Sequence, residues 1–287
     1  MEQFKMDHKL EYVIFLDLLA RAINANRGFS ISDIIDGERL WDAHNLANKF
    51  IDHAVTVLYL LHGTKVQDIP SFKFNFIDSA SIDVLTRTTM EAFLVFHYVF
   101  FAPTTTEEKD YRFWAYKAAG IAERQNLPEG IFEHERQKAE EKIVLDELHD
   151  KLKSNAVFRS LTEKQKKSVL KGQWRLLYWH DIAIDAEFSE MLASHMYRHL
   201  SGYAHSGSLS VLQIKQAIMN KEQEQLTQSS IATMNVFLAN MIWEYCGLFP
   251  KAQDVLNGEP DVNDMIKVWI DIGRRLDENL DAGRDSD

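Results

Sequence analysis

Apolar residues recur every three or four positions along most of this chain of 287 residues. Near the N-terminus, Leu10, Val13 and Ile14 are followed by Leu18 at the same spacing, which puts one apolar stripe on a helix. Similar stripes, each closed by a glycine, a proline or a polar cap, predict long helices elsewhere. The expected helices cover residues 4–24, 37–62, 78–101, 107–125, 131–153, 163–172, 185–205, 222–248 and 262–280.

The segments between these helices hold no convincing strand pattern. Residues 64–75 are expected to form a loop, and the alternation over 72–76 is isolated. Five prolines and twelve glycines are few for this length, which also favours long helices. We therefore expect an all-α fold, a bundle of long helices in a single domain over residues 1–280. A charged helical excursion at about 128–175 interrupts it, and residues 281–287 form a flexible tail.

The cysteine content, the N-terminal segment and the longest apolar run indicate the cellular compartment of the protein. The single cysteine, Cys246, excludes an internal disulfide and a cysteine-based zinc site. The N-terminus has scattered charges and no small-residue cleavage site, unlike a signal peptide. Residues 231–249 are long enough to span a membrane, but Asn235, Asn240 and Glu244 interrupt them. We expect a buried core helix there, no membrane partner and a cytoplasmic protein.

Charge is unevenly distributed along the chain. The net charge of −11 argues against general coating of nucleic acid, yet the window 151–175 has eight basic residues and one acid, Glu163. The candidate polyanion-binding residues are Lys164, Lys166, Lys167, Lys171 and Arg175. Trp174, Tyr178 and Trp179 follow and could stack on bases. The alternative is a solvated helical hairpin whose lysine stems lie on apolar surface. No DNA-specific motif is present.

The segment 197–205, Tyr-Arg-His-Leu-Ser-Gly-Tyr-Ala-His, carries the main candidate chemistry. Arg198 and His205 are seven positions apart, so in a helix they lie within about 20° of each other, two turns apart. A guanidinium can hold a phosphate and stabilise charge as it builds. An imidazole can take or give a proton at a ribose hydroxyl or at a leaving oxygen. The pair therefore indicates cleavage of RNA without a metal.

This pair resembles the motif of the HEPN superfamily, helical bundles found in bacterial toxins and defence ribonucleases. The motif is an arginine, four to six residues and a histidine, and here His199 fills the polar position that commonly follows the arginine. The resemblance implies a metal-independent endoribonuclease. Arg198 would bind phosphate, His205 would be the general acid and base, and Ser201 and His199 would orient them. It also implies RNA as a partner and a homodimer in which two motifs meet.

Two other pairs match the same short pattern. Arg39 with His44 and Arg175 with His180 have permitted spacings, as expected by chance for so short a motif. In a helix the members of each of these pairs are about 140° apart, so they face different directions. Helical geometry therefore selects one pair of the three, Arg198 with His205.

A second polar set, Arg87 and Glu91, lies at i,i+4 spacing near the start of a very apolar helix. Charges there are expected to be partly buried and to need partners. We hypothesise that this set and the signature segment converge in one polar pocket. The residues of this pocket or network are Arg87, Glu91, Tyr197, Arg198, Ser201, Tyr203 and His205. The alternative is an ion pair and a histidine that lock two core helices together.

These two segments together also resemble a second group of proteins. The Arg-x-x-x-Glu-Ala block at 87–92 and the Tyr-x-x-Leu-Ser-x-Tyr-Ala-His block at 197–205 are similar to those of a family of helical bacterial proteins without an assigned activity. The resemblance covers about two-thirds of the chain. It implies that the two blocks work together, and it implies no reaction.

Metal and cofactor chemistry has little support in the sequence. His195 and His199 have the spacing of two zinc ligands, but no glutamate follows His195, and both point away from the Arg198 and His205 face. Ser201 precedes His205 by four positions, yet no oxyanion-hole element accompanies it. No Gly-rich nucleotide-binding loop and no GxSxG motif is present. We expect no metal and no cofactor.

Two functions follow from these patterns. The first is a HEPN-like, metal-independent endoribonuclease of toxin or defence type. The alternative is a non-catalytic helical interaction or small-anion-binding protein, in which the Arg, Glu and His set is a structural network. The first requires the His205 imidazole for turnover, whereas the second requires it for stability.

Overall fold

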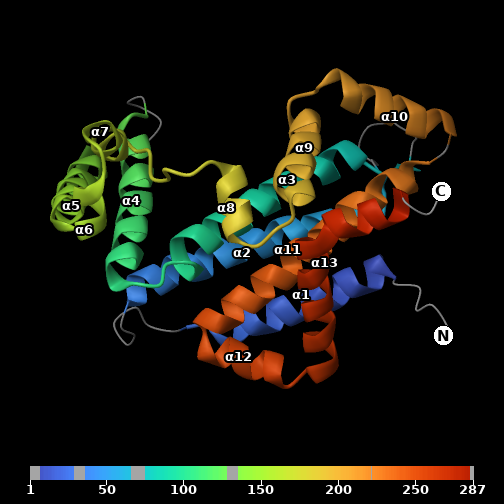
Figure 1. Ribbon diagram of the computed structural model, residues 1–287, viewed down its shortest axis with the longest axis horizontal. Coiled ribbons are helices and arrows are strands. Elements are labelled where there is room, and N and C mark those ends of the chain that lie inside the picture. The colour runs from blue at the N-terminus through green and yellow to red at the C-terminus, as the bar shows by residue number, and fades with distance from the viewer. Residues whose placement is uncertain (1–6, 29–35, 66–74, 128–134, 221, 285–287) are drawn as a thin grey trace. The chain divides into compact units, whose positions relative to one another are not determined.

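The computed structural model describes residues 7–28, 36–65, 75–127, 135–220 and 222–284 (Figure 1). Within these ranges the chain forms thirteen α-helices, two π-helical segments and one antiparallel pair of two-residue strands, β1 (Thr64–Lys65) and β2 (Asn75–Phe76). The predicted all-α class is confirmed. The short strand pair falls in the segment expected to be a loop.

The chain forms two compact units. The first is built from the described residues of 1–96 and 179–287, and the second from those of 97–178. The expected charged excursion at 128–175 lies within the sequence of the second unit. The single domain over 1–280 remains a prediction, and the expected tail at 281–287 lies partly outside the described residues.

Four long helices form the core of the first unit. α1 (His8–Ala25) packs on α11 (Gln223–Leu248), and α3 (Ser79–Phe96) packs on both α11 and α2 (Gly37–Leu61) (Figure 1). Each helix turns its apolar stripe inward, so that Phe93 of α3 meets Phe237 of α11 with ring centroids 6.3 Å apart. These buried aromatic rings supply much of the apolar burial that stabilises the unit.

α11 is the most deeply buried long helix of the first unit. Phe237, Met241 and Ile242 have no exposed surface. Its asparagines are hydrogen-bonded, Asn235 Nδ2 to the carbonyl of His8 at 2.9 Å and Asn240 Nδ2 to that of Val236 at 2.8 Å. Both amide nitrogens thus have a partner inside the protein, while the Asn235 Oδ1 is buried without one among the described residues. Among the described residues, no helix combines the length and the apolar character needed to cross a membrane.

The predicted helix at 185–205 is wrong in its first part. α8 (Trp179–Asp185) ends there, Glu187 takes a left-handed backbone with φ 61°, and a π-helical segment, Met191–Met196, leads into α9 (Tyr197–Ala204). The side chain of Asp277 accepts hydrogen bonds from the backbone N–H groups of Glu190 and Met191, each at 2.9 Å. A distant helix therefore caps the new start, and no local pattern announces it.

Three further helices complete the first unit. α10 (Ser208–Asn220) and α12 (Pro250–Asn257) were not expected from the sequence, whereas α13 (Pro260–Arg284) matches the predicted helix at 262–280. α12 begins with proline at its first position, where a missing N–H costs nothing. α10 packs against α9, α11 and α3, and this contact shapes the candidate site.

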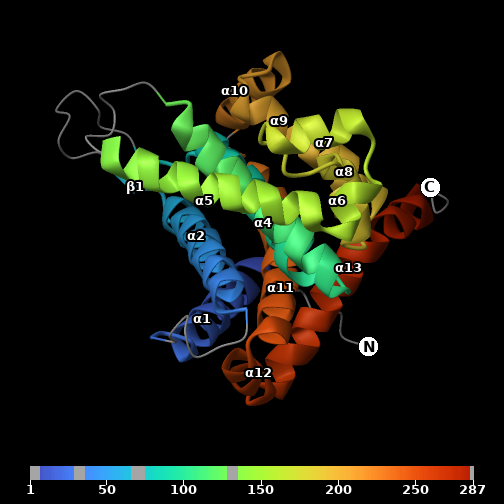
Figure 2. The ribbon, with the colours of Figure 1, turned by 90° about the vertical axis from the view of Figure 1, so that its left-hand side faces the viewer.

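The second unit consists of a π-helical turn, His97–Phe101, and four helices. They are α4 (Thr106–Gln125), α5 (Glu135–Ser154), α6 (Ala156–Ser160) and α7 (Glu163–Leu170), with α5 lying along α4 (Figure 2). α5 packs through one narrow stripe, Leu145, Leu148 and Leu152, as its high charge predicts. Threonine side chains cap α4 and α7, because the Thr105 and Thr162 hydroxyls each accept a backbone N–H.

Gly273 marks the tightest contact between α13 and the core. A Cβ added there would lie 2.7 Å from Cγ1 of Val236, a buried side chain whose β-branching prevents it from moving aside. We expect Gly273→Ala to lower the free energy of unfolding by about 1–3 kcal/mol in a urea titration. The control is Gly202→Ala in α9, where an added Cβ meets no atom within 4 Å. It should raise stability by about 0.5–1 kcal/mol, and equal effects would contradict the packing described.

Candidate functional site

The guanidinium of Arg87 lies at the centre of a polar cluster between α3 and α9. Its Nε donates to Glu91 Oε1 at 3.1 Å, its Nη1 to His205 Nε2 at 3.2 Å and its Nη2 to the Tyr197 hydroxyl at 3.2 Å. The Tyr197 hydroxyl in turn donates to Glu91 at 3.3 Å. We call Arg87, Glu91, Tyr197 and His205 the arginine cluster. It joins residues more than a hundred positions apart in the sequence.

Two helices, α3 and α9, position the side chains of the arginine cluster. Arg87 and Glu91 are i,i+4 partners on α3, where partial burial strengthens their attraction. Tyr197 and His205 are the first residue and the C-cap of α9. Since an arginine can only donate, Nε2 of His205 must be the acceptor, and in the neutral ring Nδ1 carries the proton. His205 is exposed, so a solvent-borne molecule can reach it.

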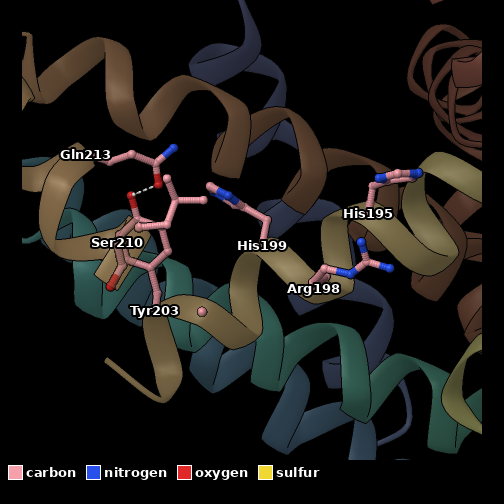
Figure 3. Close-up of a pocket in the computed structure, with 8 residues that line it drawn as sticks. His195, Arg198, His199, Tyr203, Ser210 and Gln213 are labelled. Carbon is pink, nitrogen blue, oxygen red and sulfur yellow. Dashed lines mark hydrogen bonds between the residues drawn. The ribbon is translucent and has the colours of Figure 1, made fainter. Parts of the chain in front are cut away.

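Arg198 has a different environment from the arginine cluster. It is exposed, and no hydrogen bond or ion pair joins its guanidinium to another residue in the described ranges. It lines a hollow of about 210 Å³ on the outer side of α9 (Figure 3). The hollow is lined by His195, Arg198, His199, Gly202, Tyr203, Leu209, Ser210 and Gln213. The structure thus separates Arg198 from the partner that His205 binds.

The two sites occupy adjoining faces of one helix. At 100° per residue, Tyr197, Ser201 and His205 span one side of α9, while Gly202, His199 and Tyr203 follow on the next. Arg198 and His205 differ by about 20° and lie where these faces meet, about 10 Å apart along the axis. The predicted common face is therefore present as helix geometry, although the two side chains have different partners.

Ser201 lies on the arginine-cluster side of α9. Its hydroxyl oxygen is buried and has no hydrogen-bond partner among the described residues. His199 lies on the hollow side, half-buried, with its ring 5.2 Å from that of Tyr203, and burial lowers its pKa. The two residues expected to orient the Arg198 and His205 pair thus point in different directions.

The two competing arginine–histidine pairs have structural partners. Arg39 donates to Asp36 at 2.6 Å, and the buried His44 is hydrogen-bonded to Tyr245 at 2.8 Å. Arg175 donates to the Leu177 carbonyl at 2.7 Å. These contacts account for both pairs without any chemistry, which leaves the pair on α9 as the candidate.

The histidines weighed as metal ligands both line the hollow. His195 is exposed at one end and His199 lies further in (Figure 3). Within the described part of the chain, no group of three histidine, cysteine or acidic side chains could hold a metal ion. The hollow instead combines imidazoles with the guanidinium of Arg198.

A buried carboxyl acts on Tyr203, one of the residues that line the hollow. Asp83 of α3 is 1% exposed and accepts a hydrogen bond from Ser230 of α11. Burial raises the pKa of Asp83 to about 6, against the smaller opposing effect of that hydrogen bond. Burial and the nearby Asp83 also raise the pKa of Tyr203 to about 12, so its phenol stays protonated and donates to Gln213 Oε1 at 3.1 Å.

The five candidate polyanion-binding residues lie in the second unit, on α7 and the loop after it, whereas the other basic residues of the window 151–175 lie on α5 and α6. Lys164, Lys167 and Lys171 are exposed, while Lys166 pairs with Glu163 at 2.9 Å. The whole unit has fifteen basic and thirteen acidic residues, so its positive charge is confined to this part. Half-buried Lys117 of α4 is a further cation, and burial together with Lys151 lowers its pKa.

The aromatic residues after the basic window divide into packed and exposed ones. Trp174 packs edge-on against Tyr116, with centroids 5.3 Å apart, and lies 5.9 Å from the ring of Tyr98. Tyr178 is 78% exposed. Trp174 therefore anchors the loop in the second unit, whereas most of Tyr178 is at the surface.

Comparison with known proteins identifies no relative. No family model matches the chain, and neither a curated protein nor a solved structure does. What this protein does must therefore be argued from its own residues.

Sequence reasoning missed the part of the hollow that α10 supplies. Leu209, Ser210 and Gln213 lie in a segment for which no helix was expected. A signal was present, because apolar residues at 211, 214 and 218 recur at helical spacing. The serines and glycine at 206–208 indicated that the preceding helix ends, and for that reason no new helix was expected directly after them.

The buried carboxyl gives a pH-dependent prediction. Because the folded protein binds this proton more tightly than the unfolded chain, Asp83 destabilises the fold above pH 6 and ceases to do so as the pH falls towards 4. Asp83→Asn keeps an oxygen for Ser230. We expect it to raise the free energy of unfolding by roughly 2 kcal/mol at pH 8 and to change it little at pH 4.

Urea titrations at the two pH values measure this difference. Asp52→Asn, at an exposed position on α2, is the matched control and should change stability little at either pH. A loss of stability at pH 8 in Asp83→Asn would show that the ionised carboxylate is needed in the fold.

Proposed function

We propose that this protein is a HEPN-like, metal-independent endoribonuclease of toxin or defence type. The observation that carries the proposal is the exposed imidazole of His205, held at Nε2 by a cationic guanidinium 3.2 Å away. An imidazole fixed by one neighbour and open to solvent can exchange protons with a bound substrate. Cleavage of RNA at a ribose hydroxyl needs such a group and no metal.

His205 would act first as the general base. With its lone pair at Nε2, it would take the proton of a ribose 2′-hydroxyl, whose oxygen then attacks the adjacent phosphorus. The bond to the 5′-oxygen breaks, and that oxygen receives a proton from the imidazolium. The products are a 2′,3′-cyclic phosphate and a 5′-hydroxyl. The step consumes no water and no cofactor.

Two guanidiniums would serve the phosphate. Arg198 is exposed and lies within about 20° of His205 around α9, so it would bind a phosphate oxygen. When the ribose hydroxyl binds at His205 Nε2, the Arg87 guanidinium would give up its hydrogen bond to that nitrogen and donate to the phosphate instead. Glu91 and Tyr197 would keep the guanidinium aligned. Ser201 and His199 would orient the pair from the two sides of the helix.

RNA and a second copy of the chain belong to this proposal. Lys164, Lys167 and Lys171 would attract the phosphate backbone through the local positive field. A homodimer would bring the exposed Arg198 and His205 of two copies together, as the resemblance to HEPN proteins implies. A cytoplasmic location would give such an enzyme access to RNA.

The test is cleavage of end-labelled single-stranded RNA with excess EDTA present. We expect the unaltered protein to cut RNA and His205→Ala to be at least about 100-fold slower, because general acid–base catalysis contributes at least that much. His62→Ala is the control, since His62 is an exposed imidazole at the end of α2. Equal rates for the unaltered protein and His205→Ala, or no cleavage by either, would contradict the proposal.

One observation favours the second function, a non-catalytic protein with a structural network. Contacts within the arginine cluster occupy Nε, Nη2 and one hydrogen of Nη1 of Arg87, so the guanidinium is already well satisfied. Such a network locks α9 on α3, and removal of one member leaves the others without partners.

Thermal melting separates the two functions. If His205 is a structural member of the cluster, His205→Ala should lower the melting temperature by about 2 °C, which corresponds to a loss of roughly 1 kcal/mol. As a catalytic residue at an exposed position, its loss should change stability by less than about 0.5 kcal/mol. Tyr197→Phe, which removes one hydroxyl from the same cluster, is the comparison variant for a purely structural effect.

A further inference from the structure

We propose that the hollow beside Arg198 is a subsite for one nucleotide, with the base inside the hollow and its phosphate on Arg198. The inference rests on the proposed function, because it names which part of an RNA strand lies beside His205. Its evidence is separate, however, since it comes from the outer face of α9 and from α10. None of the residues of the arginine cluster lines the hollow.

The two ends of the hollow offer different chemistry. Figure 3 shows Arg198 and His195 toward one end, Tyr203, Ser210 and Gln213 toward the other, and His199 between them. Arg198 has no partner among the described residues, so a bound anion would meet a guanidinium that is free to form charge-assisted hydrogen bonds. The ligand therefore carries a negative group at one end only.

The far end of the hollow presents hydrogen-bond donors. Because the Tyr203 phenol stays protonated and donates to Gln213 Oε1, the carboxamide is oriented with its Nε2 hydrogens available. A ligand group there must accept hydrogen bonds, as a base carbonyl or ring nitrogen does. An aliphatic tail would leave these hydrogens unsatisfied.

The middle of the hollow suits a flat ring. The His199 imidazole and the Tyr203 phenol line it, and burial favours the neutral form of His199. Leu209 adds an apolar wall from α10, and Gly202 leaves room because it has no side chain. Stacking of a base on such rings stabilises binding without fixing which base is bound.

The size of the hollow limits the ligand to one unit. Its volume of about 210 Å³ is below the ~300–1,000 Å³ typical of clefts for drug-sized molecules. It can thus take a single base, and the phosphate would remain at the exposed Arg198. Arg198 and His205 adjoin on α9, so the next ribose of an RNA strand would extend toward the imidazole.

Calorimetric titration with the four nucleoside 5′-monophosphates tests the subsite. Inorganic phosphate, the four nucleosides and a 2′-O-methylated single-stranded RNA, which cannot be cleaved, serve as comparison ligands. We expect at least one monophosphate to bind about tenfold or more tightly than phosphate or its own nucleoside, since both ends of the hollow then contribute. If the RNA binds more tightly than the monophosphate, the ligand is a strand. If the two bind with equal affinity, the ligand is the free nucleotide.

Three variants assign the contacts. Arg198→Ala should weaken monophosphate binding by about tenfold or more and leave nucleoside binding unchanged. Gln213→Ala should weaken the binding of the monophosphate and of the nucleoside by a similar factor. Gly202→Leu should abolish binding by filling the hollow, and thermal melting checks that it is folded. Arg21→Ala removes an exposed guanidinium of α1 and should have no effect.

The outcome is separable from the nuclease test. His205 does not line the hollow, so His205→Ala should bind monophosphates normally even where RNA cleavage is lost. Monophosphate binding without any RNA cleavage would support the subsite and contradict the nuclease. The subsite is overturned if no monophosphate binds better than inorganic phosphate, or if Gly202→Leu binds as well as the unaltered protein.

Discussion

The guanidinium of Arg87 holds the helix of the candidate site against the core of the first unit. α3 is packed between α2 and α11, and its buried apolar face leaves Arg87 and Glu91 at the edge of that packing. Because these two side chains are partly buried, leaving their polar atoms without hydrogen-bond partners would cost free energy. Tyr197 and His205 of α9 supply partners. The position and direction of α9 depend on this contact, and so do the two faces that α9 presents.

The same contact explains why one short helix can carry two kinds of chemistry. α9 turns its Tyr197 and His205 side toward α3, which leaves the adjoining side to meet α10. One side is a network of charged and hydroxyl groups, while the other is a small hollow lined by Arg198, which pairs with none of the described residues. Arg198 and His205 lie at the boundary. An imidazole and a guanidinium are thus adjacent without being hydrogen-bonded partners, which is the arrangement that the proposed function requires of a proton-transfer group and an anion-binding group.

The interior of the protein also contains groups whose charge depends on their surroundings. Asp83 is buried, and the burial of Tyr203 together with the nearby Asp83 raises the pKa of the Tyr203 phenol, which donates to Gln213. The basic residues of the second unit, by contrast, lie at the surface or in ion pairs such as that of Lys166 with Glu163. Their positive field would act at a distance and with strong dependence on salt. The chemistry proposed for the first unit instead depends on short contacts.

The sequence by itself determined the helical class, most helix boundaries and the i,i+4 pair of Arg87 and Glu91. All of these arise from periodicities and neighbours within a few residues. It also placed Arg198 and His205 on a common side of one helix, because seven residues make nearly two full turns.

Only the tertiary structure decided what each side chain meets. Asp277 and Gly273, more than eighty residues away, accept backbone hydrogen bonds from residues 189–191, where helical structure resumes within the expected helix at 185–205. Arg87 contacts His205, whereas no described residue pairs with Arg198. α10 forms the hollow by packing on α9, a contact between segments that the local pattern treated as a terminus. Such choices depend on which distant surfaces are buried together, and no local spacing contains that information.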